Sequence, residues 1–354
     1  MKTEILEIDK NNIDRDKILR AAQILKSGGL VAFPTETVYG LGANALDEKA
    51  VRKIFEAKGR PSDNPLIVHI ADVSWVSRLA REVPCIAESL MESFWPGPLT
   101  LVMAKSGAVP AAVTAGLDTV AVRMPSHPVA LALISQAEIP VAAPSANVSG
   151  KPSPTAAGHV IDDLFGKVDI IIDSGRTDVG LESTVLDLTA DPPEILRPGG
   201  VTAHQLKKVA GSVIGEFAMQ NNGEEGGFAD STPKSPGLKY AHYSPEAKVI
   251  VIEGELQSVA GMIVKLAREY ASKGMKIGVL ATKETEGFYA GMEVVCAGSR
   301  AEPETIAANL FAALREFDRR GVKLVLAEAV DSSGIGCAIM NRLVKAAGYD
   351  IIKA

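Results

Sequence analysis

A polar interruption near residues 220–246 divides this chain and limits what it can fold into. The segment is rich in Gly, Pro, Ser and Asn and has no apolar periodicity, which is typical of a linker. The whole chain, at 354 residues, also exceeds one typical domain. The sequence therefore predicts a first domain at 1–210, a linker at 211–246 and a second domain at 247–354.

Short apolar runs alternate with amphipathic stretches before the linker, as expected for an α/β domain. The predicted strands lie at 30–33, 66–70, 100–103, 120–124, 141–143, 170–172 and 184–188. Helical spacing occurs at 18–25, 50–55 and 129–134.

The same alternation returns after the linker. Strands are predicted at 249–252, 277–280 and 324–327, and helices at 259–271, 305–317 and 338–347. Strands that alternate with helices favour a smaller Rossmann-like βαβ domain with a parallel sheet.

Composition excludes several classes of protein. Three cysteines without paired spacing fit a reducing compartment, and five scattered histidines without CxxC or HExxH predict no metal site. The N-terminus is too charged for a signal peptide, and no uncharged apolar run approaches a membrane span. We therefore expect a cytoplasmic protein that does not enter the membrane.

Charge argues against nucleic acid as the principal partner. The net charge is −6, and residues 1–210 carry 21 Lys and Arg against 25 Asp and Glu, a net of −4. A protein that grips nucleic acid usually has a basic excess. The one basic cluster comprises Lys49, Arg52, Lys53, Lys58 and Arg60, and its first three members are typical of a solvated helix face. Direct RNA binding is therefore expected to be weak or indirect.

Polar loops follow predicted strands, where open α/β sheets bind ligands. The first loop, PTETVYGLG at 34–42, contains Thr37. Its Gly-x-Gly lacks the third glycine of a dinucleotide fingerprint, so a tight turn fits equally well.

A second loop follows the predicted helix at 50–55. Lys58 and Arg60 flank a glycine, and Asn64 and prolines follow. Paired cations in a constrained loop fit a phosphate clamp, although a charged surface turn also fits. His69 on the next strand is, by itself, more typical of a core histidine.

A third loop leaves a strand of small residues, 141–143, and contains Ser145, Asn147 and Ser153. Short donors on a constrained loop can surround an anion. No nearby His or Asp would activate Ser145 as a nucleophile, so binding is its better role.

Arginines also occur inside apolar strand patterns. Thr119 and Arg123 share one predicted strand, and Arg197 lies in another, downstream of Ser183. A buried arginine needs a partner, which a bound carboxylate or phosphate or a structural ion pair would supply.

These segments carry a family resemblance. PTETVYGLG, KGRPSDNPLIVHI, APSANVSGKPSPT, ESTVLD and LRPGG closely resemble the motifs of the YrdC/Sua-type threonylcarbamoyl-AMP synthases. GIGCAIMNRL at 334–343 resembles the end of the longer, Sua-type members. The resemblance implies a twisted, mixed, open sheet with helices, a Sua-type C-terminal domain, and a linker that folds over the active site.

The resemblance also implies a reaction. The amine of L-threonine captures bicarbonate, and the carbamate attacks the α-phosphate of ATP and expels pyrophosphate. Mg²⁺ would be carried by the triphosphate. The product, threonylcarbamoyl-AMP, would pass to a threonylcarbamoyl transferase that modifies tRNA.

Residue roles follow from the same resemblance. The catalytic signature would be Lys58, Arg60, Ser145 and Asn147. The ATP-binding set would be Arg60, Asn64, Thr119, Ser145, Ser153, Arg197 and Tyr243, and the L-threonine set Thr37, His69, Arg123, Ala143 and Ser183. The rival interpretations are a double-stranded RNA-binding module of the same fold and a domain that forms a carbamoyl-adenylate.

Overall fold

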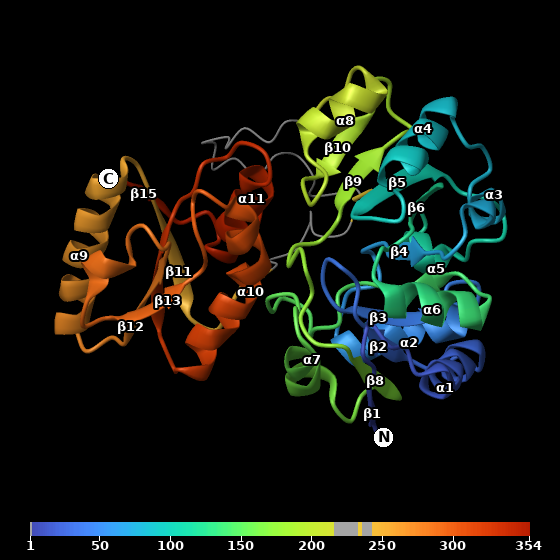
Figure 1. The fold of residues 1–354 in the computed structure, drawn as a ribbon, viewed down its shortest axis with the longest axis horizontal. Helices are drawn as coiled ribbons and strands as arrows, with labels where there is room; N and C mark the ends of the chain where they lie inside the picture. The colour runs from blue at the N-terminus through green and yellow to red at the C-terminus, as the bar shows by residue number, and fades with distance from the viewer. Residues whose placement is uncertain (1, 216–232, 236–242) are drawn as a thin grey trace. The chain divides into compact units, whose positions relative to one another are not determined.

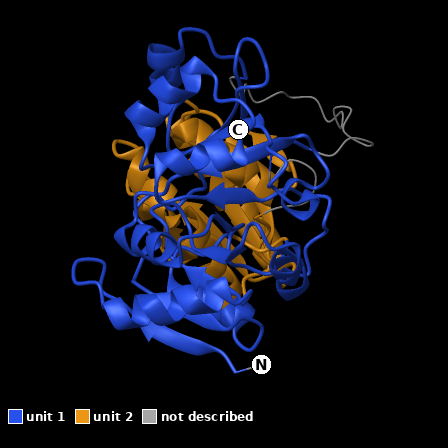
Figure 2. Cartoon of the chain, turned by 90° about the vertical axis from the view of Figure 1, so that its right-hand side faces the viewer, with its two compact units in different colours: residues 1–149, 153–239 blue, residues 150–152, 240–354 orange. Residues whose placement is uncertain are grey.

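The computed structural model describes residues 2–215, 233–235 and 243–354. The chain forms two compact units (Figures 1 and 2). Unit 1 comprises residues 1–149 and 153–239, and unit 2 comprises residues 150–152 and 240–354. Most of the predicted linker lies outside the described residues, so its predicted path stays a prediction.

A mixed ten-stranded sheet forms the centre of unit 1 (Figure 1). Its strand order is β1-β8-β2-β3-β7-β4-β6-β5-β9-β10. The strands are β1 Glu4–Glu7, β2 Val31–Phe33, β3 Gly40–Asn44, β4 Ile67–His69, β5 Leu99–Ala104, β6 Thr119–Arg123, β7 Val141–Ala142, β8 Ile170–Asp173, β9 Thr184–Asp187 and β10 Glu194–Arg197.

Eight α-helices surround this sheet among the described residues of unit 1. They are α1 Arg15–Lys26, α2 Glu48–Lys58, α3 Val76–Leu79, α4 Cys85–Phe94, α5 Ala111–Thr114, α6 Pro128–Ala137, α7 Ala157–Leu164 and α8 Ala203–Ala210. Asp14 and Asp47 cap α1 and α2 by accepting backbone N–H groups. Gly59, at φ 60°, ends α2 in the left-handed conformation that glycine tolerates.

The two faces of the sheet carry different side chains where β4, β5, β6 and β9 lie side by side. Val68, Leu101, Val122 and Leu186 point into the main core. Their neighbours in sequence point to the other face and form a separate small apolar cluster of Ile67, Val102, Ala121 and Val185. Side chains at alternate positions on these strands therefore share that second face.

Unit 2 contains a five-stranded sheet with order β13-β12-β14-β11-β15, and all its pairs are parallel. The strands are β11 Lys248–Glu253, β12 Ile277–Ala281, β13 Glu293–Cys296, β14 Leu324–Glu328 and β15 Ile351–Lys353. The helices are α9 Leu256–Ser272, α10 Pro303–Arg319 and α11 Gly336–Ala346. One face is packed by α9 through Val259 and Ile263.

The predicted fold class is confirmed, since a mixed α/β sheet is followed by a smaller parallel one. The prediction that Lys58 lies in a loop is wrong. It is the last residue of α2 and is 2% exposed, because the helical spacing continues past residue 55 and ends at Gly59. The Gly-x-Gly of 40–42 is part of strand β3 and not a tight turn.

Candidate active site

Strand register determines how the predicted site residues are spread over the second face. The parallel pair β4 and β6 places His69 opposite Arg123 at the carboxyl ends. Thr119 begins β6, four residues or about 13 Å away. The antiparallel strand β7 runs back along β4, so its exit toward Ser145 lies at the same end as Thr119. The sheet therefore separates two groups of polar residues.

The first group is centred on Lys58. Its Nζ donates to the carbonyl oxygens of Ser145 and Asn147, each at 2.5 Å. Ser145 Oγ donates to Asn147 Oδ1 at 2.5 Å, and Ser149 N donates to Lys58 O at 2.9 Å. Three of the four predicted signature residues are thus in direct contact, and Lys58 fixes the backbone of the loop.

The remaining signature residue and its neighbour lie in the loop before β4. The Arg60 Nη2 atom lies 3.5 Å from Asn64 O and 3.4 Å from Pro65 O, so these contacts are long. Asn64 is 1% exposed, and its Oδ1 has no hydrogen-bond partner among the described residues. Since buried polar atoms are normally paired, this oxygen marks a place where a ligand donor or water fits.

The second group is centred on Arg123, which is 3% exposed. Its Nη1 donates to Thr37 Oγ1 at 2.9 Å, its Nε donates to Gly97 O at 3.2 Å, and its Nη2 lies 2.6 Å from Glu36 Oε1. The ion pair compensates a buried guanidinium that would otherwise be costly. The loop 34–39 thereby holds Arg123 in one orientation.

His69 lies beside this arginine and is neutral. Burial, reinforced by the positive charge of Arg123, lowers the pKa of His69 to about 3. Its Nδ1 is buried with no hydrogen-bond partner among the described residues. A neutral imidazole can donate a hydrogen bond to an uncharged hydroxyl or accept one from it.

Ser183 and Arg197 complete the same end of the site. Arg197 donates from Nε to Ser183 O at 3.1 Å and from Nη2 to Ser183 Oγ at 3.2 Å. Ser183 Oγ also shares a 2.8 Å hydrogen bond with Thr100. Arg197, which the resemblance assigns to ATP, therefore contacts a residue of the predicted threonine set.

Small and apolar side chains lie between the two groups. Ala121 is on β6 between Thr119 and Arg123, and it belongs to the small apolar cluster with Ile67. Ala143 N donates to Ile67 O at 2.9 Å. The face thus has an apolar middle and polar groups at both ends, an arrangement that orients a ligand with two charged parts.

Tyr243 belongs to unit 2. Its ring stacks on Phe311 with centroids 5.1 Å apart, and the guanidinium of Arg342 lies 5.6 Å from its centroid. The ring is 5% exposed. Its assignment to the nucleotide stays a prediction.

Two acidic residues of the site are absent from the predicted set. Glu36 is the ion-pair partner of Arg123, and Glu182 Oε1 accepts a 2.5 Å hydrogen bond from Ser153 Oγ. Both are buried. Each stands directly beside a predicted site residue, within PTETVYGLG and ESTVLD, so acidic residues inside those motifs were the available signal.

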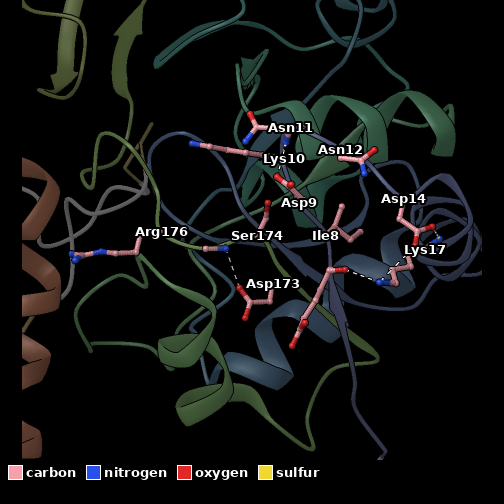
Figure 3. A pocket seen from close by; sticks show the side chains of 12 residues that line it. Ile8, Asp9, Lys10, Asn11, Asn12, Asp14, Lys17, Asp173, Ser174 and Arg176 are labelled. Atoms are coloured by element: carbon pink, nitrogen blue, oxygen red, sulfur yellow. Dashed lines mark hydrogen bonds and ion pairs between the residues drawn. The ribbon is translucent and has the colours of Figure 1, made fainter.

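A separate hollow of about 940 Å³ lies between residues 7–17 and 173–176 (Figure 3). It contains none of the predicted site residues. Two of its charged groups have local partners: Lys17 Nζ donates to Glu7 O, and Asp173 Oδ1 accepts from Gly175 N. This hollow is not the candidate site.

The fold is that of a YrdC-like α/β domain followed by a Sua-type domain. A family model described as "Telomere recombination" matches residues 23–199, and one described as "Threonylcarbamoyl-AMP synthase, C-terminal domain" matches residues 201–348. The threonylcarbamoyl-AMP synthase of Pyrococcus abyssi is 53% identical, over 97% of this chain and 98% of that protein. The enzyme of Bacillus subtilis is 49% identical, over 98% and 97%.

A solved structure agrees with these relatives. That of P. abyssi Sua5 complexed with L-threonine superposes with a TM-score of 0.92 at 51% identity, covering 100% of both chains. The chain belongs to the threonylcarbamoyl-AMP synthase family. Within residues 2–215, 233–235 and 243–354, no helix is long and apolar enough to cross a membrane.

Proposed function

We propose that this protein makes threonylcarbamoyl-AMP and pyrophosphate from L-threonine, bicarbonate and ATP. The observation that carries the proposal is the spacing of two polar groups across an apolar floor. Arg123 lies at one end, together with Ser183 and Arg197. The cluster of Lys58, Ser145 and Asn147 lies at the other end. The family relationship supports the same reaction.

In this proposal L-threonine binds at the Arg123 end. Arg123 faces the amino-acid carboxylate, because a guanidinium pairs well with that group. Ser183 and Thr37 supply hydroxyls, and His69, which is neutral, takes the threonine hydroxyl.

ATP binds with its phosphates toward Lys58, Arg60, Ser145 and Asn147. Asn64, Thr119 and Ser153 complete the nucleotide set at this end. Arg197, which contacts Ser183 at the Arg123 end, and Tyr243, which belongs to unit 2, are also proposed to contact the nucleotide. Mg²⁺ would be coordinated by phosphate oxygens and water, and would neutralise charge on the triphosphate.

The reaction balances without a further reagent. The threonine amine attacks the carbon of bicarbonate, giving a carbamate with loss of water. A carbamate oxygen then bonds to the α-phosphorus as the bond to pyrophosphate breaks. Such a reaction depends on positioning and charge stabilisation, for which cations and short hydroxyl donors at fixed positions are suited.

The product is a mixed anhydride that hydrolyses readily in water, so an acceptor must consume it. We propose that a threonylcarbamoyl transferase acting on tRNA takes it over in the cytosol.

Pyrophosphate release tests the proposal. We expect ATP-dependent release that requires both L-threonine and bicarbonate. L-2-Aminobutyrate lacks only the hydroxyl, so it leaves a buried polar group unpaired and should react at least tenfold more slowly. Equal rates with the two amino acids would refute the threonine site, and salt-sensitive RNA binding without pyrophosphate release would favour the RNA-binding alternative.

A further inference from the structure

Three residues of the Ser145–Ser153 loop belong to a different unit from the rest of that loop. Gly150–Pro152 group with unit 2, whereas the chain on both sides groups with unit 1 (Figure 2). Asn147 precedes this segment by three residues, and Ser153 follows it directly. The segment is therefore bounded by two residues that the proposed function assigns to ATP.

Three hydrogen bonds within unit 2 hold the segment. Arg315, on α10, donates to Pro152 O from Nε at 3.1 Å and from Nη2 at 2.6 Å. Ser244 N donates to Gly150 O at 2.9 Å. The Arg315 side chain is buried, with the residue 8% exposed.

The residue types suit this arrangement. A guanidinium presents two N–H groups in a rigid fork, so both lone pairs of one carbonyl oxygen can be satisfied. Gly150 has φ 92°, and an added Cβ would meet nothing within 4 Å. Its requirement for glycine thus comes from the backbone conformation and not from crowding.

The two sides of the segment are held separately within unit 1. Ser149 N donates to Lys58 O at 2.9 Å, and Ser153 Oγ donates to Glu182. The carbonyl oxygens of Gly150 and Pro152 accept hydrogen bonds from Ser244 and Arg315. Without these contacts the three residues would regain backbone freedom, and ATP binding would have to order them again.

We propose that Arg315 is a positioning residue for the ATP-binding loop. It acts through Pro152 and touches neither substrate. This inference rests on the proposed function for its ligand.

The test compares variants of one helix. Arg315→Met removes the donors and keeps much of the side-chain length, and Arg315→Lys keeps the charge and a single donor group. Arg319→Met is the matched control, because Arg319 is on the same helix, its side chain is 75% exposed, and it pairs with Glu316 on that helix. Hydrogen exchange of peptide 145–155 is measured without ligand, and the dissociation constants of ATP and L-threonine are measured separately.

We expect Arg315→Met to speed exchange in the peptide and to raise the dissociation constant of ATP about tenfold, as the loss of a charge-assisted hydrogen bond implies. L-Threonine affinity should change less than twofold, Arg315→Lys should be intermediate, and Arg319→Met should match the wild type. Unchanged exchange in Arg315→Met would overturn the proposal. Equal weakening of both ligands with a lower unfolding midpoint would also overturn it, because that pattern indicates loss of the fold.

Gly150→Ala provides a second route to the same loop without altering α10. It should also weaken the binding of ATP more than that of L-threonine. The double variant with Arg315→Met should raise the dissociation constant of ATP by less than the product of the two single effects, since both changes act on one segment. Fully multiplicative effects would count against the proposal. If the wild type bound no ATP, the proposed function would fail, while the exchange measurement would still decide whether Arg315 orders the loop.

Discussion

The two units each contain a buried polar cluster, and the clusters differ in how completely their atoms are paired. In unit 2, Glu328 ends β14 and accepts from Tyr289 Oη at 2.6 Å, Thr282 Oγ1 at 3.1 Å and Arg300 Nη2 at 2.9 Å. In unit 1, Glu36 Oε2, Asn64 Oδ1 and His69 Nδ1 are buried without hydrogen-bond partners among the described residues.

Both clusters lie at strand ends, where α/β sheets bind ligands. Position in the sheet therefore does not separate them. Completeness of hydrogen bonding does, because a paired network is stable without a ligand, whereas unpaired buried atoms cost free energy until something binds. We infer that the unit 2 cluster is structural and that the unit 1 cluster is a binding site.

The largest expected effect is at Arg123. Arg123→Met should reduce turnover on the order of 10³-fold and destabilise unit 1 by about 3–5 kcal/mol, since Glu36 is left as a buried, uncompensated charge. Adding Glu36→Gln should recover stability but not L-threonine binding. The exposed pair of Arg20 with Glu4 offers a control, and Arg20→Met should cost about 0–1 kcal/mol. Recovery of L-threonine binding in the double variant would show that Arg123 only balances Glu36.

Variants of Lys58 and Arg60 should distinguish a role in phosphate binding from a role in stabilising the loop. Both Lys58→Met and Arg60→Met should reduce pyrophosphate release on the order of 10²-fold, because each removes a cation from the phosphate end. Only Lys58→Met should also lower the unfolding midpoint, since the carbonyls of Ser145 and Asn147 lose their donor. Lys49→Met, at an exposed position on the same helix, is the control. Equal stability of the Lys58 and Arg60 variants would contradict the role of Lys58 in fixing the loop.

His69 gives unit 1 a pH dependence. Its pKa is about 3 in the folded protein and near 6.5 when unfolded, so between these values the unfolded state binds the extra proton. Stability should therefore fall as pH falls through this window, by about 3 kcal/mol from pH 7 to pH 4. His69→Gln should remove that part of the dependence, and His204→Gln, at an exposed position, should not. Identical pH profiles for the wild type and His69→Gln would show that burial does not hold the imidazole neutral.

The smallest expected effect is in unit 2. Tyr289→Phe removes one donor from Glu328 and should destabilise the unit by about 1–2 kcal/mol with unchanged pyrophosphate release. The pKa of the Tyr289 hydroxyl is raised by burial and by Glu328, which agrees with a phenol that remains a donor. Tyr349→Phe, with Tyr349 69% exposed, should have no effect. A loss of turnover in Tyr289→Phe alone would mean that paired networks can also be functional here.

Periodicity was sufficient to predict much of the fold but missed strand β3 in the interior of the sheet. The seven strands predicted in unit 1 all correspond to observed strands. Strand β3 has the sequence GLGAN, and its glycines have low strand propensity. Gly42 is nevertheless required there, because an added Cβ would lie 2.8 Å from both Phe33 and Val141. Tertiary packing of this kind leaves no trace in a local pattern.

The site was predictable by residue type and motif, and less so by partner. The sequence brought Lys58, Ser145 and Asn147 forward as one group, and the structure places them in contact. It gave no indication that Glu36 pairs with Arg123 or Glu182 with Ser153, because pairing across 87 or 29 positions depends on strand order. The contacts of Arg315 with Pro152 likewise could not be predicted from the spacing of residues in the sequence.

The dependence of Pro152 on Arg315 has a consequence for biosynthesis. These two residues are 163 positions apart in the chain, and synthesis proceeds from the N-terminus. Strand β1 can pair only after β8 has been synthesised, since Glu4 pairs with Ile170. The segment 150–152 can be held by Arg315 only after α10 has been synthesised, which is later still. Under the proposed function, a nascent chain that has completed its first sheet should therefore bind L-threonine normally but bind ATP about tenfold more weakly until α10 has left the ribosome.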